Sequence, residues 1–579
     1  MLTLWFTLVP IALAGPPDLS KRDAPPRARL AIPATLQSMS GTLFRQLSQP
    51  ERRGNDRPQL VLELSHPGAA EALAALPGVT VELQVDRLLQ VRTDWHTLEA
   101  LAQHPGVLRV REPRRAAPKE VYSEGLDDLF GPDWSDLGLT GAGVKIAVLD
   151  VGFEGYAALL GSELPTTVET HMVSDWADSD HGTDVAQVIH DIAPDAELVL
   201  YSFDTDVEFL SAVEHIISSD AHLVNASVGF DNQWHANGTS AWSQAVDLVH
   251  AAGITWINAA GNEADCYWVG TLTDEDDDGW LELDGDELFV VESDWTQDAE
   301  VDVSLRWDDA FGRSSNDLDL FIDRIDFEVG DEHCDSGEDA QDGDDDPYER
   351  AWCDLGGGAE YAYASVYLYD GVGVGKTGWL YSYESLPEEN RTYHQSLTLP
   401  ADAAGGIAVA AVDWEIDQIV YYSSRGPTDD GRDKPDVAAP TFVSTTNGRF
   451  TGTSAAAPHV TGAAALALEA TLLSMDPEAI RDWLGSQTLD LGDPGFDYTY
   501  GHGYLRLVAL PGEGDDTGDT GDRDSDVLDT DDDIDTPPPG ESSESKCGCA
   551  TNTTGWSAAL LLMALASLVR GRRRPRHGR

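Results

Sequence analysis

Basic side chains are scarce in this sequence: 36 Lys and Arg residues stand against 103 Asp and Glu residues, giving a formal net charge of −67. Nucleic-acid binding requires a basic surface that displaces counterions from phosphates, so the composition argues against a nucleic-acid partner. The acidic residues concentrate around 270–350 and 512–544. Such runs are mostly solvated surface, and some of them bind cations.

Cysteine is rare as well, with five residues among 579. Cys334 and Cys353 flank an acidic loop, and an oxidising compartment would allow a disulfide between them. Apolar residues make up 41% of the chain, which is ample for folded domains. A chain of this length exceeds one hydrophobic core and predicts roughly three or four domains.

The N-terminus and the region after residue 511 lack the pattern of a folded domain. Residues 1–14 form an apolar run that closes on Ala12-Leu13-Ala14, the small-residue pattern of a secretory cleavage site, although no Lys or Arg precedes it. We therefore expect a signal peptide over residues 1–14, with a buried helix as the alternative. Residues 512–546 are mainly Asp, Gly, Thr, Pro and Ser, which predicts a disordered acidic spacer.

Residues 547–579 combine the sequence CGC, an apolar stretch from Trp556 to Val569 and an Arg-rich end. The stretch is short for a spanning helix, which needs about 20 residues, and the Arg cluster would hold the C-terminus on the cytoplasmic side. We expect a C-terminal sorting or membrane anchor here, with a dispensable basic tail as the alternative.

Residues 40–118 include a small folded unit. Its residue pattern predicts strands at 57–64, 79–84, 87–93 and 107–112, and helices at 69–76 and 95–103. The order β-α-β-β-α-β is that of a ferredoxin-like unit. On this order alone, the unit is either a propeptide or an accessory domain.

From about residue 140, apolar strands alternate with helical stretches, notably at 184–193 and 240–252. This alternation predicts an α/β fold with a doubly wound, mainly parallel sheet over residues 125–263 and 401–511. Residues 264–400 interrupt it with short alternating runs rich in Asp, Trp and Tyr, which predict an inserted, acidic β-rich domain of the sandwich kind.

Ligands of such parallel sheets bind beyond the carboxyl ends of the strands, where Asp150 falls. His181 starts a predicted helix in DHGTDVAQ, and Ser454 starts another in GTSAAAPHVTG. A serine becomes a nucleophile when a histidine takes its proton, and a carboxylate fixes that histidine. Each residue alone has an ordinary structural alternative, as a strand-end cap, a structural histidine or a helix cap. Together they predict nucleophilic catalysis.

These motifs resemble those of the subtilisin-like serine peptidases (subtilases) over roughly residues 135–262 and 400–510, in the family's order Asp, His, Ser. The resemblance implies a subtilisin-like α/β fold and a serine endopeptidase that acts on protein or peptide substrates. It assigns Asp150, His181 and Ser454 to the catalytic triad and Asn262, from AAGN, to the oxyanion hole. It implies no cofactor for catalysis.

The resemblance also implies a set of substrate-binding residues. In the family, the strand equivalent to NASVGF pairs with the peptide main chain, and the segment equivalent to AAGN forms the opposite wall of the P1 pocket. The corresponding residues of this sequence are Ser227, Gly229, Ala259, Ala260 and Gly261.

The sequence departs from the family pattern at several positions around these motifs. Val151 follows the aspartate where the family usually has Ser or Thr, and the histidine motif carries Asp184 and Gln187. Phe230 stands where the family often has Gly, which leaves the size of the pocket open. We expect these changes to alter the rim of the site and the pocket, with the triad intact.

Within this family, residues 40–118 resemble the propeptide, an inhibitor and intramolecular chaperone, with self-cleavage expected within 113–125. The C-terminal segment resembles the myxobacterial-type sorting tail (MYXO-CTERM), which implies secretion, or display on the surface of a Gram-negative cell through a membrane or sorting machinery. A binding protein on a retired protease scaffold, and a maturation protease for one partner, are the alternative functions.

One acidic turn of the insert is a candidate calcium site. Asp274, Asp276 and Asp278 alternate along the chain and precede a glycine, which suits a hard cation that takes oxygen ligands. The full EF-hand pattern also requires a glutamate where Gly285 stands. A solvated acidic turn is therefore an equal alternative to structural Ca²⁺.

Overall fold

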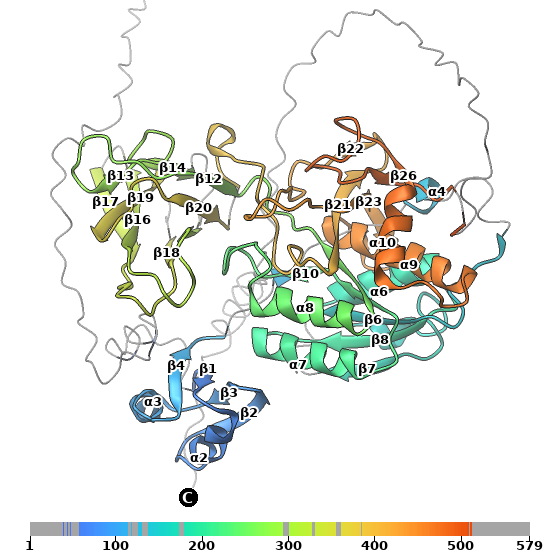
Figure 1. Ribbon diagram of the computed structural model, residues 1–579, viewed down its shortest axis with the longest axis horizontal. Coiled ribbons are helices and arrows are strands. Elements are labelled where there is room, and N and C mark those ends of the chain that lie inside the picture. The colour runs from blue at the N-terminus through green and yellow to red at the C-terminus, as the bar shows by residue number, and fades with distance from the viewer. Residues whose placement is uncertain are drawn as a thin grey trace, which may run out of the picture.

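The computed structural model describes residues 57–113, 117–118, 125–129, 137–172, 179–292, 300–326, 330–354, 361–383, 385–508 and 510–511, together with Met39, Leu43 and Leu47. Figure 1 shows three folded parts: a small N-terminal unit in blue, a large α/β domain, and a green-to-yellow β-rich region. The expected signal peptide, acidic spacer and C-terminal anchor lie outside the described residues. Among the described residues, no helix combines the length and apolar character needed to cross a membrane.

The N-terminal unit is an antiparallel four-stranded sheet of order β2-β3-β1-β4. Alternation along β1 sends Leu60, Leu62 and Leu64 into a core with the two helices, and Val61 to the opposite face, where it meets Val207 of helix α7. The order of strands and helices agrees with the pattern read from the sequence. Its elements are β1 (Gln59–Leu64), the 3-10 helix η2 (Pro67–Ala69), α2 (Ala70–Ala74), β2 (Thr80–Val85), β3 (Leu88–Arg92), α3 (Trp95–Ala102) and β4 (Val107–Arg111).

The α/β domain is built on a ten-stranded sheet of order β26-β27-β23-β21-β11-β9-β6-β8-β7, with β22 paired to β21. All pairs are parallel except β26–β27 and β21–β22. The strands are β6 (Lys145–Asp150), β7 (Glu169–Met172), β8 (Glu197–Ser202), β9 (Leu223–Ala226), β11 (Thr255–Ala259), β21 (Gly406–Asp413), β22 (Gln418–Ile419), β23 (Val437–Thr441), β26 (Thr488–Leu489) and β27 (Tyr504–Leu505).

Helices cover both faces of this sheet, which is why its central strands are apolar along their length. One face packs against α6 (His181–Ile192), α9 (Thr453–Ala470) and α10 (Pro477–Ser486), and the other against α7 (Asp206–Ile217) and α8 (Ala241–Ala251). The remaining elements are α4 (Leu126–Leu129), α5 (Tyr156–Leu159), β5 (Ala117–Pro118), β10 (Val228–Gly229), β24 (Val443–Thr445), β25 (Gly448–Phe450) and η4 (Glu388–Asn390).

The β-rich region lies between β11 and β21 in the chain and forms two antiparallel sheets around one core. One sheet has the order β12-β20-β15-β18, and the other β13-β19-β16-β17 with β14 paired to β19. Its first and last strands are neighbours, since Tyr267 of β12 pairs with Tyr381 of β20. The strands are β12 (Tyr267–Thr271), β13 (Trp280–Leu281), β14 (Phe289–Glu292), β15 (Glu300–Trp307), β16 (Asp317–Asp326), β17 (Gly330–Gly337), β18 (Tyr348–Asp354), β19 (Tyr361–Asp370) and β20 (Thr377–Ser382).

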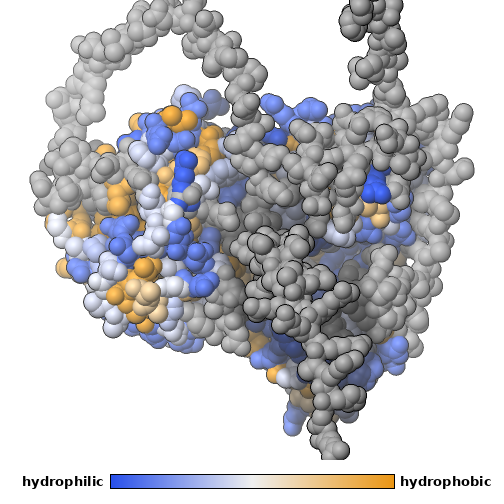
Figure 2. Space-filling view, turned by 180° about the vertical axis from the view of Figure 1, so that it is seen from behind, coloured by the Kyte–Doolittle hydropathy of each residue, from blue (hydrophilic) through white to orange (hydrophobic). Residues whose placement is uncertain are grey.

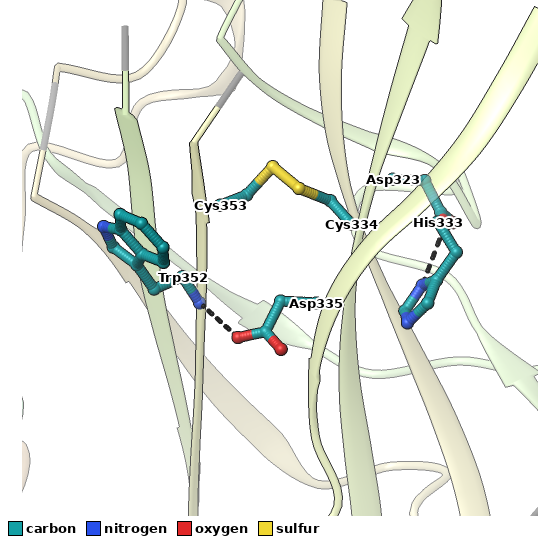
Figure 3. The surroundings of a disulfide bond; sticks show 6 residues. All are labelled: Asp323, His333, Cys334, Asp335, Trp352 and Cys353. Atoms are coloured by element: carbon teal, nitrogen blue, oxygen red, sulfur yellow. Dashed lines mark hydrogen bonds and ion pairs between the residues drawn. A yellow bond between two sulfur atoms is a disulfide. The ribbon is translucent and has the colours of Figure 1, made fainter. Parts of the chain in front are cut away.

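A disulfide joins Cys334 of β17 to Cys353 of β18, with their Cα atoms 5.7 Å apart, as the sequence suggested. It links the two sheets, because β17 and β18 belong to different ones. Figure 3 shows how a hydrogen bond from the Trp352 main-chain N–H to the Asp335 carboxylate, 3.0 Å long, adds a second link beside the disulfide.

Arg306 of β15 holds the β-rich region against the α/β domain. The residue is 2% exposed, and its guanidinium donates to Asn232 Oδ1 and Asp429 Oδ2, both at 2.7 Å. It also lies 2.9 Å from His235 Nδ1 and 4.2 Å from the ring centroid of Trp379. Burial, followed by the Arg306 charge, lowers the pKa of His235, so this histidine is neutral and accepts at Nδ1.

One strand of the N-terminal unit, β4, contacts both other parts. Arg109 and Arg111 lie on the same face of β4, since they alternate along it. Arg111 donates to Asp206 at the start of α7 at 2.6 Å, and Arg109 pairs with Asp346 of the β-rich region at 3.0 Å. Figure 2 shows the face of the molecule opposite to that of Figure 1, where hydrophilic and hydrophobic residues are interspersed over the described surface.

Candidate active site

Asp150 and His181 are in direct contact at the carboxyl edge of the sheet. Asp150 ends β6 and His181 begins α6. His181 Nδ1 lies 2.8 Å and 2.9 Å from the two carboxylate oxygens of Asp150, and the residues are 5% and 0% exposed. A carboxylate in this position holds the proton on Nδ1 and leaves Nε2 as the basic nitrogen.

Ser454 lies in the first turn of α9, at the carboxyl end of the neighbouring strand β9. Its hydroxyl donates to the Ser227 carbonyl at 2.9 Å, and the Ser227 hydroxyl donates back to the Ser454 carbonyl at 3.0 Å. The Ser227 side chain therefore faces α9, so any contribution of this residue to substrate binding comes from its main chain. The structure thus brings Asp150 next to His181, and Ser454 next to Ser227.

Asn262 follows β11 and is oriented by Thr453, the residue before Ser454. The amide oxygen of Asn262 accepts the Thr453 N–H at 2.8 Å and the Thr453 hydroxyl at 3.0 Å. Since the oxygen end is used in this way, the side chain presents its NH₂ group as the donor that an oxyanion hole requires. Thr453 also accepts the Gly261 N–H at 3.1 Å, and the φ of 117° at Gly261 is one that favours glycine.

The predicted pocket wall is fixed to the next strand. Ala259 and Ala260 are fully buried, and the Ala260 main chain donates to Val409 and accepts from Thr398, both at 3.0 Å. Both polar main-chain groups of Ala260 are therefore used in the fold, so this part of the wall is rigid.

Strand β10 carries an extended segment along one edge. Val228 pairs with Pro118 and Gly229 with Ala117, both antiparallel, so β5 adds a second strand to β10. A side chain at Gly229 would collide with Thr398, whose Oγ1 lies 2.1 Å from the ideal Cβ position. Gly229 is therefore needed for close packing beneath the strand.

Phe230 belongs to the core of the domain. It is 1% exposed and stacks on Trp242 with ring centroids 4.3 Å apart, within the cluster between the sheet and helices α7 and α8. The ring therefore packs between the sheet and helices α7 and α8.

Asp184 and Gln187, which differ from the family's usual histidine motif, connect helix α6 to the β24–β25 hairpin. Asp184 Oδ1 accepts from the side-chain amides of Gln187 and Asn447, each at 2.9 Å. Gln187 Oε1 accepts the Thr446 N–H at 3.0 Å. The unusual letters in HGTDVAQ were the only signal in the sequence, and they did not identify the hairpin as the partner.

Burial shifts two titratable groups near the site. It raises the pKa of Asp184 to about 6. It lowers the pKa of His459, on α9 one turn after Ser454, to about 4. His459 Nδ1 lies 2.7 Å from the Ala455 carbonyl, an interaction that needs a proton on Nδ1.

Two acidic clusters lie away from the triad, in the β-rich region. Ligand atoms of Asp274, Asp276 and Asp278 lie within 4.8 Å of one another, in the loop before β13. Asp274 accepts the N–H groups of Asp278 and Gly279, so the loop is ordered by its own carboxylate. Oxygen ligands at this spacing fit Ca²⁺.

A second cluster, which the sequence reading missed, gathers Asp342, Asp344 and Asp345 within the same distance. Its only signal was the run DGDDD, which also describes a solvated loop.

Known proteins resemble this chain over the same segments. The model of the subtilase family matches residues 141–280 and 386–503. The minor extracellular protease Vpr of Bacillus subtilis (strain 168) is 26% identical over 408 residues, which cover 61% of this chain and 49% of that protein. The alkaline elastase YaB of Bacillus sp. (strain YaB) is 25% identical over 198 residues, 30% of this chain and 49% of that protein.

Among solved structures, the CspB protease of Clostridium perfringens superposes with a TM-score of 0.46 and 14% identity, over 66% of this chain and 95% of that one. The chain spans about half the length of the curated relatives it matches. The two segments matched by the family contain the residues Asp150, His181, Asn262 and Ser454. These two segments of the chain are therefore similar to the subtilase family of serine peptidases.

Proposed function

We propose that this chain is an endopeptidase made as an autoprocessed precursor, and that it cleaves peptide bonds through Asp150, His181 and Ser454. One observation carries the proposal: Ser454 Oγ is held 2.9 Å from the Ser227 carbonyl, directly beside a strand that already pairs with an extended segment of the chain. A peptide bound along β10 would therefore run past the nucleophile.

In the proposed mechanism, the Ser454 hydroxyl turns from the Ser227 carbonyl and gives its proton to His181 Nε2 as Oγ attacks the peptide carbonyl. Asp150 stabilises the imidazolium, and the Asn262 amide and the Ser454 N–H donate to the oxyanion. His181 then protonates the leaving amine, and water repeats the cycle to release the acyl group. The nucleophile, the base, the carboxylate and the oxyanion donors of this mechanism all belong to the chain itself.

The N-terminal unit acts as the propeptide in this proposal. It packs on α7, is joined there by the buried Arg111–Asp206 pair, and is followed by β5 in the substrate position. Ala117 lies opposite Gly229 and Pro118 opposite Val228. We propose that this antiparallel register continues by one residue in the precursor, which would bring Lys119 opposite Ser227. Because the Ser227 carbonyl contacts Ser454 Oγ, we expect self-cleavage between Lys119 and Glu120.

We further propose that the chain is exported by its signal peptide and either released or displayed at the cell surface through residues 547–579. The name of the Bacillus subtilis relative, an extracellular protease, supports export. Bound Ca²⁺ at Asp274, Asp276 and Asp278 would stabilise the loop before β13 without taking part in the chemistry.

The test compares the full chain with the variant Ser454→Ala, by loss of the N-terminal unit in mass spectrometry and by labelling with a fluorophosphonate. The proposal expects processing and labelling of the wild type, and neither in the variant. A folded, processed wild type that neither labels nor cleaves a peptide library contradicts the proposal and favours the binding protein on a protease scaffold. Assays with casein and with a peptide set then distinguish the two protease hypotheses. A broad protease cleaves casein, whereas a maturation protease cleaves only a few peptides.

A further inference from the structure

Helix α6 presents three polar residues on one face, because positions 181, 184 and 187 follow the spacing of a helical turn. His181 is the base of the proposed mechanism. Asp184 and Gln187 do not touch the reacting atoms, yet they are buried, at 7% and 3% exposure. Burying a carboxylate and an amide is costly unless each gains hydrogen bonds, so their partners indicate what they do.

Those partners lie in the turn of the β24–β25 hairpin. Asn447, an exposed residue of the turn, donates its amide to Asp184 Oδ1 at 2.9 Å. The Thr446 N–H donates to Gln187 Oε1 at 3.0 Å, and Gln187 in turn donates to Asp184 at 2.9 Å. The hairpin is short, and a short two-stranded ribbon is marginally stable alone, so these bonds to α6, together with the burial of Val443 and Phe450, hold it in place.

The same hairpin leads into the catalytic serine. Strand β25 ends at Phe450, which is 2% exposed and whose ring lies 5.4 Å from the His181 ring, centroid to centroid. Ser454 follows shortly in the chain, at the start of α9. Helix α6 thus carries His181 at its start and, through Asp184 and Gln187 in its next two turns, binds the hairpin that precedes Ser454 in the chain.

We propose that Asp184 and Gln187 are positioning residues, which lock the β24–β25 hairpin to α6 and so hold Phe450 against His181 and set the placement of Ser454. The inference rests on the proposed function, since it takes His181 and Ser454 as the reacting pair. It gives a role to the two residues by which HGTDVAQ departs from the family's usual pattern.

The charge of Asp184 adds a pH-dependent element to this lock. Its ionised carboxylate is the stronger acceptor for the two amides. Burial raises the pKa of Asp184 to about 6; hydrogen bonds from Thr445 and Asn447 oppose the rise, as does the charge of His181, whereas the charge of Asp180 adds to it. Further charged groups here are Asp150, which pairs with His181, and Arg449 of the hairpin, whose guanidinium lies over the Phe442 ring. Protonation of Asp184 near pH 6 therefore weakens the lock.

The experiment measures the rate of fluorophosphonate labelling and the kcat and KM for a peptide substrate, using the full chain. Asp184→Ala and Asn447→Ala should each lower the labelling rate and kcat by about tenfold or more, with KM little changed, because small displacements of reacting groups are costly. Since both changes break the same hydrogen bond, between Asp184 and Asn447, the double variant should lose no more activity than the worse single variant. Asn447 is exposed, so Asn447→Ala tests the lock without endangering the fold.

Asp184→Asn is the conservative rescue. It keeps an oxygen acceptor for both amides but removes the charge, so it should recover most of the labelling rate. It should also move the acid limb of kcat/KM to lower pH, because a nearby negative charge favours the imidazolium form of His181. Asp247→Ala is the matched control: Asp247, on α8 on the opposite face of the sheet, also accepts a hydrogen bond from a loop, in this case from the main-chain N–H of Gly405 at 2.7 Å. This control should leave kcat and the labelling rate unchanged.

Labelling and kcat of Asp184→Ala and Asn447→Ala equal to those of the wild type would overturn the inference, as would additive losses in the double variant. An acid limb of Asp184→Asn that coincides with that of the wild type would overturn the pH-dependent part. Failure of the proposed function is visible separately, because the wild type itself would then take no label.

Discussion

Replacing Arg306 by Met should loosen the β-rich region from the α/β domain, because this buried arginine is the charged centre of their contact. The guanidinium bonds to Asn232 and Asp429 and lies over Trp379. Met retains most of the side-chain volume, so the change removes charge and hydrogen bonds more than packing. The perturbation therefore isolates the polar part of the interface.

The size of the effect depends on the buried Asp429 carboxylate, which loses its partner charge. Asp429 keeps its bond from the Ala236 N–H at 2.8 Å, but its carboxylate, 5% exposed, loses the arginine charge. Leaving one member of a buried ion pair uncompensated costs about 3–5 kcal/mol. The lost contact with Trp379 adds about 1 kcal/mol. We therefore expect Arg306→Met to lower the free energy of unfolding of this interface by at least about 3 kcal/mol.

Hydrogen exchange is the suitable assay, since it reports opening of the interface separately from unfolding of the whole chain. Protection should fall in β15 and in the loop at 231–240, and remain in β6 and α9. Asp429→Leu combined with Arg306→Met removes both charges, and should cost less than the sum of the two single changes. A loss below about 1 kcal/mol for Arg306→Met, or strict additivity in the double variant, would refute the reasoning.

Further predictions concern processing, the disulfide and acid stability. N-terminal sequencing of the processed wild type should give Glu120 as the first residue, and a start more than two residues away contradicts the register derived from β5 and β10. Replacing Cys334 and Cys353 by Ser opens a loop of sequence separation 19 and should lower the stability of the β-rich region by about 3 kcal/mol, measured by urea unfolding; an unchanged midpoint would exclude a stabilising role. Because burial lowers the pKa of His459 to about 4, the unfolded chain binds this proton at higher pH than the folded chain, so stability is complete above pH ~6.5 and is lost as pH falls towards 4. Between pH 7 and 4.5 the wild type should lose about 2–3 kcal/mol more than His459→Gln in denaturant titrations, and parallel pH profiles would disprove this.

The elements that carry the site could be predicted because their signals are local. The apolar run ending in Asp150 indicated a buried strand, and the small residues after Ser454 indicated a helix that packs closely on the sheet; both are present, as β6 and α9. Helix α6 begins at His181, as the histidine motif predicted, three residues before the helical stretch that periodicity indicated at 184–193. Periodicity locates the body of a helix better than its ends.

The contacts between distant residues could not be predicted. The hydrogen bond between Asp184 and Asn447 joins positions separated by 263 residues, and no local pattern connects them. The Ser227 hydroxyl likewise bonds to the Ser454 carbonyl of α9, a partner 227 positions away that strand periodicity does not reveal. Such contacts depend on the tertiary fold, and the residue pattern predicts only the class of that fold.

The paired ends of the β-rich region bear on how the sheet can assemble. Strands β11 and β21 are neighbours in the sheet although residues 259 and 406 lie far apart in the chain, and a long loop between neighbours makes closure slow and entropically costly. Once β12 and β20 have paired, the connection shortens to 260–266 and 383–405, roughly two halvings of its length, which reduces the closure cost by about 1 kcal/mol. An order of events in which the β-rich region folds first would thus bring the two halves of the ten-stranded sheet together, and would let a module of this kind be gained or lost without breaking the sheet around it.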